Sequence, residues 1–321
     1  MAVEQVAGRV QFRYRSRGLL GNAVRRLIKK PKAVVAILVL LFLYGNGIFA
    51  NLIAPYPYTE FDTSAVRQGP SAEHWLGADQ VGRDVLSRLM YSMRANLILT
   101  ITSMVTGTLV IGITLGLVAG YYRKWADTII SRLGEVFLAF PGILLMILMA
   151  ATLKPRVLEL TRALEDSTGI TGLVRWGLAD YLVIYFALAA VSWVGMMRLV
   201  RGQILYLKET QYVDSAKAMG ASAARIIFVH LLPNALPPII VSVSMALGAI
   251  AGAEVVLSWL GIGIQPPVPS LGTMISRGQD ISTLRNHPHI ILPPVIVVGI
   301  LIFAWNLLGD ALNDVLNPRT R

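Results

Sequence analysis

The stretch DSAKAMGASAARIIFVHLLP occupies residues 214–233 and lies between two long apolar segments. Its first half is polar and built from small residues, and Gly220 stands in its middle. Glycine adopts turn conformations that are closed to most residues, so we predict a helix over about 212–219, a turn, and a second helix over about 223–231. A membrane protein rarely keeps so organised a polar loop unless something docks on it. We therefore expect a docking surface here, with a partnerless interfacial helix as the alternative.

The segments around this stretch indicate a membrane protein. The chain of 321 residues is 55% hydrophobic and only 15% charged, whereas soluble domains carry about 25% charged residues. Apolar runs long enough to cross a bilayer, about 20 residues each, occur at 34–54, 97–121, 129–152, 181–200, 236–262 and 290–312. A backbone that crosses the membrane must satisfy its own hydrogen bonds, which only helices and closed β-barrels achieve. No segment shows the alternation of apolar and polar residues that is typical of a barrel strand. We predict an all-α, polytopic protein with six transmembrane helices.

Lysine and arginine are concentrated on one side of the predicted membrane. Residues 1–33 contain nine of them, and the turn after the second span, the 198–235 loop and the tail bring that side to 19 of 29. Basic loops stay in the cytoplasm, so both termini and the 198–235 loop are predicted to be cytoplasmic. This topology, with anionic lipid at the inner face, explains the net charge of +11 without a nucleic-acid partner.

These assignments divide the chain into segments. The N-terminal part consists of a basic cytoplasmic segment at 1–33 with an amphipathic piece at about 19–28, a first transmembrane helix at 34–54 and an outside loop at 55–96. A five-helix core follows at 97–312, and a cytoplasmic tail at 313–321 ends the chain. The core contains the cytoplasmic loop 205–235 and an outside insertion at 153–180.

Within the outside loop, Gly77 and Gly82 should form turns, and Asp84 should cap or charge-balance the start of a helix that carries Arg88 and Arg94. Apolar residues in the insertion predict one short amphipathic helix that ends at Gly169 and Gly172. That helix lies either on the membrane surface or against an external partner.

Several residues inside the spans have a packing and a pathway interpretation. Gly112 and Gly116 lie on one face of the second span, where small residues let helices approach closely in lipid, so we favour packing. Glu254, with Ser258 one turn later, is the main ionisable residue within a span. It either hydrogen-bonds a neighbouring helix or lines a pathway, and we favour the hydrogen bond.

Prolines are predicted to shape two of the spans. Pro141 should kink the third span, because proline removes a backbone donor and clashes with the preceding turn. By the same reasoning, Pro233, Pro237 and Pro238 should redirect the chain as it enters the fifth span.

Motifs for catalysis and for metal binding are missing from the sequence. The chain has no GxxxxGK[ST] loop to hold nucleotide phosphates, no HExxH and no GxSxG. It has no cysteine, and its four histidines are scattered along the chain, which argues against disulfides and metal sites. We expect a chain without enzymatic activity, without a metal and without a cofactor of its own.

Four segments together resemble one transporter family. Residues 74–97, HWLGADQVGRDVLSRLMYSMRANL, resemble its outside signature H-x-L-G-T-D-x-x-G-R-D-x-x-S-R. Residues 254–274, EVVLSWLGIGIQPPVPSLGTM, and residues 306–319, NLLGDALNDVLNPR, resemble its E-x-x-L-S-F-L-G-L-G-x-Q-P-P-x-P-x-W-G and N-x-x-G-D-x-L-R-D-x-L-D-P-R segments. Residues 214–233 resemble its coupling loop. The chain is similar to the second permease subunit of dipeptide, oligopeptide and nickel ABC importers, within the binding-protein-dependent transport family.

This resemblance implies a type I ABC importer transmembrane domain in the cell membrane, forming half of a pore for peptides. It implies four partners: a homologous second permease subunit, two cytoplasmic ATPases that hold ATP and Mg²⁺, and an extracytoplasmic solute-binding protein. ATP binding would move the coupling loop and open the pore toward the binding protein by alternating access.

The resemblance also implies the site residues. ATPase coupling falls to Asp214, Ser215, Ala216, Ala218, Gly220, Leu232 and Pro233, and the outside signature near the binding protein consists of Gly77, Asp79, Gly82, Arg83 and Asp84. We expect the small side chains of Ala216 and Ala218 to leave a smooth surface that seats in a groove of the ATPase.

Departures from the family pattern leave the substrate open. Leu271 replaces the usual Trp, Asn313 replaces Arg, and the 153–180 insertion is longer than the resemblance implies. Dipeptides, longer peptides, nickel chelates and oligosaccharides all stay candidates. An inert scaffold subunit would not need the spacing of residues 214–233. A secondary transporter without an ATPase would need intramembrane charge or inverted repeats, which the sequence does not clearly contain.

Overall fold

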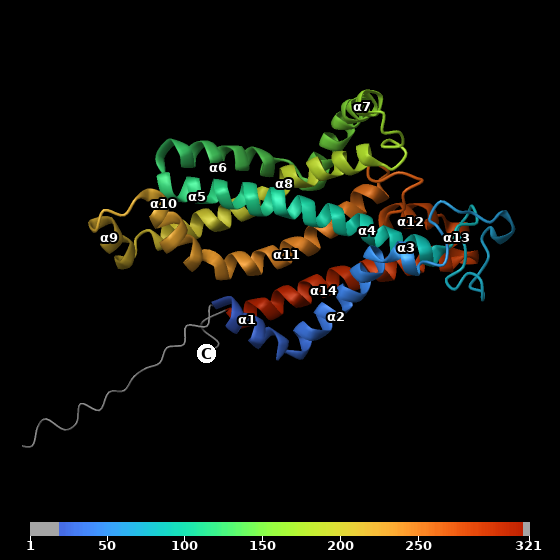
Figure 1. The fold of residues 1–321 in the computed structure, drawn as a ribbon, viewed down its shortest axis with the longest axis horizontal. Coiled ribbons are helices and arrows are strands. Elements are labelled where there is room, and N and C mark those ends of the chain that lie inside the picture. The colour runs from blue at the N-terminus through green and yellow to red at the C-terminus, as the bar shows by residue number, and fades with distance from the viewer. Residues whose placement is uncertain (1–18, 317–321) are drawn as a thin grey trace, which may run out of the picture.

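The computed structural model describes residues 19–316 of the chain. In this part of the chain the regular structure is helical and no strand is formed, which confirms the all-α prediction. The helices form an elongated bundle with the 55–84 loop at one end and α9 (Gln211–Ala218) at the other (Figure 1). The basic segment before residue 19 and the tail after residue 316 lie outside the described residues.

The first helices follow the predicted N-terminal organisation. α1 (Leu19–Ile28) coincides with the predicted amphipathic piece, and α2 (Pro31–Ile48) with the short α3 (Ala50–Ile53) forms the first span. α2 packs along α14 (Leu292–Leu316), although the two helices lie at opposite ends of the sequence (Figure 1).

The second span begins earlier than the hydropathy pattern predicts. α4 (Val85–Ser103), the π-helix η2 (Met104–Gly112) and α5 (Ile113–Tyr122) follow one another as one span. The helix predicted to start at Asp84 is therefore present, but residues 85–96 belong to the second span and not to the outside loop. The predicted span start at 97 was wrong because polar residues such as Ser92 and Asn96 are buried against other helices, and hydropathy alone does not distinguish such residues from a loop.

The third span is sharply bent. α6 (Lys124–Ala139) and α7 (Gly142–Thr168) meet at 91° across the break that contains Pro141, so the predicted kink is confirmed. The amphipathic helix predicted for the insertion is not separate, because Val157 continues the buried face of α7 that begins at Ala150. α7 ends at Gly169, as predicted, with the left-handed φ of 70° that glycine adopts readily.

Residues 214–233, which resemble the family's coupling loop and are called the coupling segment below, lie between two long helices. α8 (Leu178–Leu207) leads into α9, and α10 (Ala223–Arg225), the π-helix η3 (Ile226–Leu231) and α11 (Leu232–Trp259) then form a single span of 37 residues. The three prolines at 233, 237 and 238 therefore lie within one uninterrupted helical span and do not end it. Membrane helices tolerate proline because neighbouring helices and local π-turns satisfy the freed backbone groups.

The remaining elements are short. They are η1 (Thr63–Ala65) in the 55–84 loop and, between α11 and α14, α12 (Leu271–Gly278), α13 (Ile281–Asn286) and η4 (Pro288–Ile290). All of them gather at the end of the bundle that lies opposite α9 (Figure 1).

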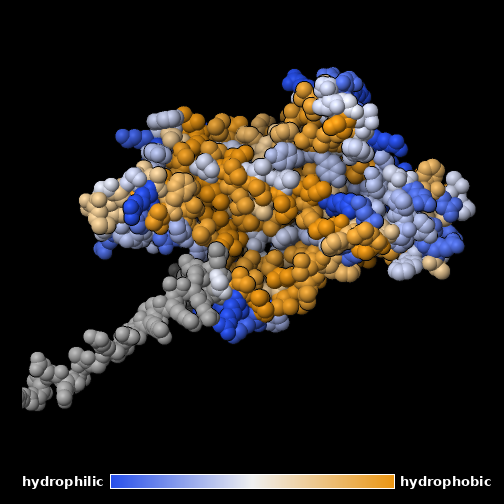
Figure 2. Space-filling model, in the orientation of Figure 1, coloured by the Kyte–Doolittle hydropathy of each residue, from blue (hydrophilic) through white to orange (hydrophobic). Residues whose placement is uncertain are grey.

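The long helices have the length and surface of a membrane bundle. Within residues 19–316, five helices are long and apolar enough to cross a membrane, and six if the bent α6–α7 pair forms one span. Figure 2 shows an apolar surface along the middle of the bundle, with hydrophilic residues toward its ends. This distribution agrees with the polytopic prediction.

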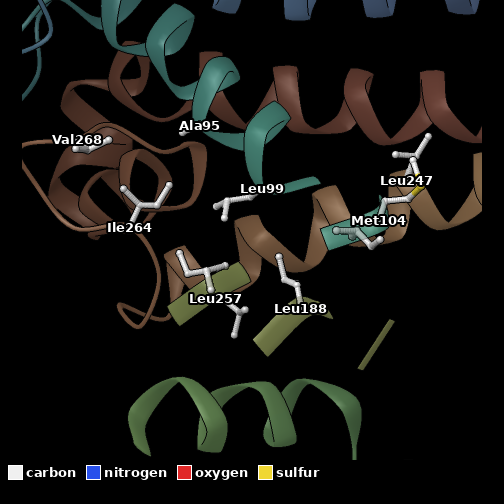
Figure 3. Packing of buried hydrophobic residues seen from close by; sticks show 10 residues of the cluster. Ala95, Leu99, Met104, Leu188, Leu247, Leu257, Ile264 and Val268 are labelled. Carbon is white, nitrogen blue, oxygen red and sulfur yellow. The ribbon is translucent and has the colours of Figure 1, made fainter. Parts of the chain in front are cut away.

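Close packing joins the long helices. A Cβ atom at Gly112 would lie 2.8 Å from Cβ of Met196, and one at Gly116 would lie 2.6 Å from Cβ of Val200, so these glycines let η2 and α5 approach α8. Leucines at 99, 188 and 257, from α4, α8 and α11, meet in a core cluster (Figure 3).

Candidate functional site

α9 carries the polar residues of the coupling segment at the tip of the bundle (Figure 1). Asp214 and Ser215 are both exposed. Asp214 Oδ1 forms an ion pair with Lys217 Nζ at 2.9 Å, and Ser215 Oγ donates to the carbonyl of Gln211 at 2.9 Å. Asp214 lies in the first turn of α9, where a carboxylate is stabilised by the helix dipole. The outer face of α9 is thus ordered and open to a partner.

Ala216 and Ala218 lie on opposite sides of α9. Ala216 is buried, as is Val213, whereas Ala218 is exposed. The expectation of one smooth docking surface is therefore wrong, because residues two apart are separated by about 200° around a helix. Val213 belongs to an apolar cluster with Leu117 of α5, Ile204 of α8 and Leu231 of η3, and α9 contacts η3, which fixes α9 to the bundle.

Gly220 forms the turn that ends α9. Its φ is +79°, Ala221 N–H donates to the carbonyl of Ala216 at 3.0 Å, and Gly220 N–H donates to that of Lys217 at 2.9 Å. This pair of bonds is the Schellman arrangement that favours glycine. The predicted glycine turn is present. Leu232 and Pro233 lie beyond it, half-buried at the start of α11.

Met219 was not recognised from the sequence, and it is the most exposed large apolar residue on the coupling segment. Its side chain is 82% exposed directly before Gly220. Methionine is flexible and polarisable and is common on protein-binding surfaces. The available signal was a single large apolar residue at the end of an otherwise polar helix.

At the other end of the bundle, the outside signature folds around Asp79. Its Oδ1 atom accepts hydrogen bonds from the N–H groups of Val81 at 2.9 Å and Arg83 at 3.0 Å. The guanidinium of Arg88, which is buried, lies 3.8 Å from its Oδ2 atom. Arg83 differs, since its Nε and Nη1 atoms are buried without a hydrogen-bond partner among the described residues. Asp79 therefore organises the turn, while Arg83 is only partly satisfied.

The two glycines of the signature are needed for close packing. Gly77 and Gly82 have φ values of +79° and +81°. A Cβ at Gly82 would lie 1.8 Å from the carbonyl oxygen of Asp62, and one at Gly77 would lie 2.5 Å from the ring of His289. Hydrogen bonds from Ser64 hold the pKa of the Asp62 carboxyl below its ordinary value. The loop is thus folded tightly onto itself and onto η4.

Asp84 caps α4, as predicted. Its Oδ2 atom accepts a hydrogen bond from Ser87 N–H at 2.7 Å, while its Oδ1 atom lies 3.0 Å from His74 Nδ1. Both members of the His74–Asp84 pair are buried. The sequence indicated the cap but not the histidine partner, because the loop that brings His74 to Asp84 has no local pattern.

Glu254 lies in a closed hydrogen-bond network between helices. Asn96 Nδ2 donates to its Oε2 atom at 2.7 Å, and Ser258 Oγ donates to its Oε1 atom at 2.8 Å. Tyr44 donates to Asn96 Oδ1 at 3.3 Å and accepts from Trp305 Nε1 at 3.2 Å. The hydrogen bond from Glu254 to a neighbouring helix, favoured from the sequence, is present, and its carboxylate is shut off from solvent.

The predicted residues thus fall into three separate groups. The coupling residues lie at one end, the outside signature lies at the other, and Glu254, Ser258, Gly112 and Gly116 lie inside the bundle (Figure 1). In residues 19–316, no group of three or more histidine, aspartate or glutamate side chains could hold a metal ion. Any communication between the two ends must run through the long helices.

Comparisons with known proteins agree with this arrangement. Residues 112–321 match the model of the binding-protein-dependent transport system inner membrane component. Residues 18–70 match the N-terminal TM domain of oligopeptide transport permease C. The two matches correspond to the core and to the additional first span.

Curated relatives and a solved structure extend these matches. The glutathione transport system permease protein GsiD of Pectobacterium atrosepticum is 37% identical, with 92% of this chain and 90% of that protein covered. The dipeptide transport system permease protein DppC of Alkalihalophilus pseudofirmus is 36% identical, with 94% and 90% covered. A chain of the MetNI methionine ABC transporter, in inward-facing conformations, shares the fold with a TM-score of 0.51 and 19% identity over 72% of this chain and 96% of that chain.

Proposed function

We propose that this chain, which belongs to the family of binding-protein-dependent transport system inner membrane components, forms half of a pore that imports di- and oligopeptides. Relatives named as dipeptide and glutathione permeases cover most of its length, which supports a peptide substrate. The chain is the membrane subunit of an ABC importer, and separate ATPase subunits supply the energy.

The observation that carries this proposal is the exposed tip of α9. Asp214, Lys217 and Met219 face outward, whereas Val213 and Ala216 hold the same helix against the bundle. A helix with one anchored face and one ordered, open face suits a load-bearing contact between subunits. The ATPase subunits would bind this face, a homologous permease would complete the pore, and a solute-binding protein would dock near the 55–84 loop.

Two substitutions in the coupling segment test the ATP-driven function. Gly220→Val places a β-branched residue at a φ of +79°, and Asp214→Lys reverses the charge of the outer face of α9. In vesicles that contain the complete complex, both variants should insert normally and lose ATP-driven peptide uptake. The matched controls are Gly220→Asn, because asparagine tolerates left-handed backbone, and Asp214→Asn. Uptake that survives both Gly220→Val and Asp214→Lys would show that α9 does not couple to an ATPase.

Competition decides the substrate class. Uptake of a labelled dipeptide by the complex should be inhibited by unlabelled di- and oligopeptides and not by nickel chelates or oligosaccharides. Inhibition by either of the latter, without inhibition by peptides, would replace the peptide assignment.

We also propose that both termini and α9 face the cytoplasm. The excess of lysine and arginine on that side supports it. The chain contains no cysteine, so single cysteines can be introduced at the exposed positions Thr63 and Ser215. A membrane-impermeant maleimide added to intact cells should label Thr63→Cys and leave Ser215→Cys unlabelled. The opposite pattern would invert the topology.

A further inference from the structure

The joint between α8 and α9 is short and is held by another part of the chain. α8 ends at Leu207 and α9 begins at Gln211, so only Lys208, Glu209 and Thr210 separate them. Without other contacts, so short a connection would allow α9 to hinge relative to α8. Both charged residues of the joint, however, bind the turn between α5 and α6.

Lys208 binds the end of α5. Its Nζ atom donates to the carbonyl of Tyr121 and lies 4.8 Å from the centre of the Tyr121 ring. A cation over an aromatic face contributes about 0.5–1 kcal/mol at exposed sites and more when water is excluded. Burial, with repulsion from Arg123 and Lys217, lowers the pKa of Lys208 from its ordinary value. Lys208 is thus drawn from solvent toward α5.

Glu209 binds the turn itself. Its Oε1 atom lies 2.6 Å from Arg123 Nη2. Arg123 and the next residue, Lys124, have φ values of +54° and +53°, and sparsely populated backbone of this kind costs L-residues on the order of 1–3 kcal/mol each. Strained backbone of this kind persists only where surrounding contacts hold it, and Glu209 supplies one such contact.

A third contact joins α8 to α6, further along α8 from the joint. Arg201 of α8 forms a two-pronged ion pair with Asp127 of α6, at 2.5 Å from Nε to Oδ1 and 2.8 Å from Nη2 to Oδ2. Ser131 donates to the same Oδ1 atom at 3.1 Å. Both charged side chains are half-buried, and paired geometry of this kind is among the stronger ion-pair arrangements.

We propose that the α5–α6 turn locks the α8–α9 joint, so that α9 moves as one rigid body with the adjoining ends of α5, α6 and α8. The lock consists of Lys208–Tyr121, Arg123–Glu209 and Arg201–Asp127, and the apolar cluster to which Val213, Leu117 and Ile204 belong supports it. This inference rests on the proposed coupling role of α9. It makes Asp127 and Arg201 positioning residues that transmit displacement without touching the ATPase or the substrate.

Charge reversal tests the lock. Asp127→Arg and Arg201→Asp, each alone, should reduce peptide uptake per ATP hydrolysed by at least about fivefold, the lower end of typical coupling between sites. The double variant, which restores an ion pair in reverse, should recover that ratio. A merely structural role would lower complex yield or melting temperature and leave the ratio unchanged. Unchanged ratios in the single variants, or a double variant that does not recover, would overturn the inference.

Two further measurements keep the test decisive. If a reversed variant does not assemble, Asp127→Asn removes the charge with little change of shape and should lower the same ratio; an unchanged ratio would overturn the lock. Glu135→Gln breaks the Arg132–Glu135 pair of 2.9 Å, which lies within α6 alone, and should leave the ratio at the wild-type value. Wild-type vesicles that import no peptide would refute the proposed function, whereas wild-type uptake with unaffected variants would refute the lock alone.

Cross-linking examines the same inference from the opposite direction. Arg123→Cys and Glu209→Cys can be joined in this cysteine-free chain by a flexible bifunctional thiol reagent. If α9 moves rigidly with α5 and α6, the cross-linked complex should import peptide at least as fast as the same variant before cross-linking, because the link replaces the ion pair that the two substitutions remove. A joint that hinges during transport would be blocked, and loss of uptake on cross-linking would contradict the proposal.

Discussion

Asn96 donates a 2.7 Å hydrogen bond to Glu254, and both side chains are closed to solvent. The two residues come from α4 and α11, and Ser258 completes the partners of the carboxylate from the next turn of α11. Both of these neighbours donate to the two carboxyl oxygens of Glu254. The Ser258 hydroxyl also accepts from Ile264 N–H at 3.3 Å, which ties the network to the loop after α11.

Replacing Glu254 should therefore reveal a structural rather than a pathway role. Glu254→Ala leaves the Asn96 and Ser258 donors unsatisfied, at about 1–3 kcal/mol for each buried group. Glu254→Gln keeps the shape but places an amide N–H₂ against a donor, so its cost should be smaller. Thermal unfolding of the purified chain, followed by tryptophan fluorescence, should rank the wild type above Glu254→Gln and Glu254→Ala last. Normal melting of Glu254→Ala combined with lost transport would point to a pathway role instead.

The glycine contact between α5 and α8 should be sensitive to one added carbon. A Cβ at Gly116 would lie 2.6 Å from Cβ of Val200, so Gly116→Ala should destabilise the bundle by about 1–3 kcal/mol through overpacking. The matched control is Gly195→Ala in α8, where a Cβ meets no atom within 4 Å. There alanine should be neutral or should stabilise by up to about 1 kcal/mol. Equal melting temperatures of the two variants would argue against close packing.

Two substitutions at Asp84 should separate its two roles. Asp84→Ala removes both the cap of α4 and the partner of His74, and loss of a cap alone costs about 0.5–2 kcal/mol. Asp84→Asn keeps an oxygen that can accept from Ser87 N–H and removes only the charge. Limited proteolysis of the 55–84 loop should be much faster in Asp84→Ala than in Asp84→Asn. Equally fast cleavage of both would show that the charged form of Asp84 beside His74, and not the cap, holds the loop.

Met219 should contribute to ATPase binding through its apolar surface. Its side chain is 82% exposed at the tip of the bundle, and burying it in a partner would remove apolar area from water. Met219→Asp should weaken the affinity of purified ATPase subunits for the permease by about tenfold, equivalent to about 1.4 kcal/mol. Met219→Leu, which keeps the apolar volume, should bind like the wild type. Unchanged binding of Met219→Asp would place the contact elsewhere on α9.

Local signals were sufficient for much of this organisation. The amphipathic α1, the cap at Asp84, the bend at Pro141 and the turn at Gly220 all lie where the residue types predict them. Each depends on the conformational range of one residue or on a repeat within a few turns. Motif spacing likewise identified the family, because it requires no knowledge of contacts.

Tertiary packing decided the rest. Ala216 faces the bundle rather than a partner, residues 85–96 belong to the second span despite their polar side chains, and α7 continues through the predicted insertion. The partner of Glu254 stands 158 positions away in Asn96, and that of Asp127 stands 74 positions away in Arg201. Hydropathy and propensity are properties of near neighbours, so the sequence by itself determined the helices, their candidate membrane spans and their caps. Which buried polar groups meet is set only when distant helices pack, because a hydrogen bond or ion pair depends on distances that the local pattern does not contain.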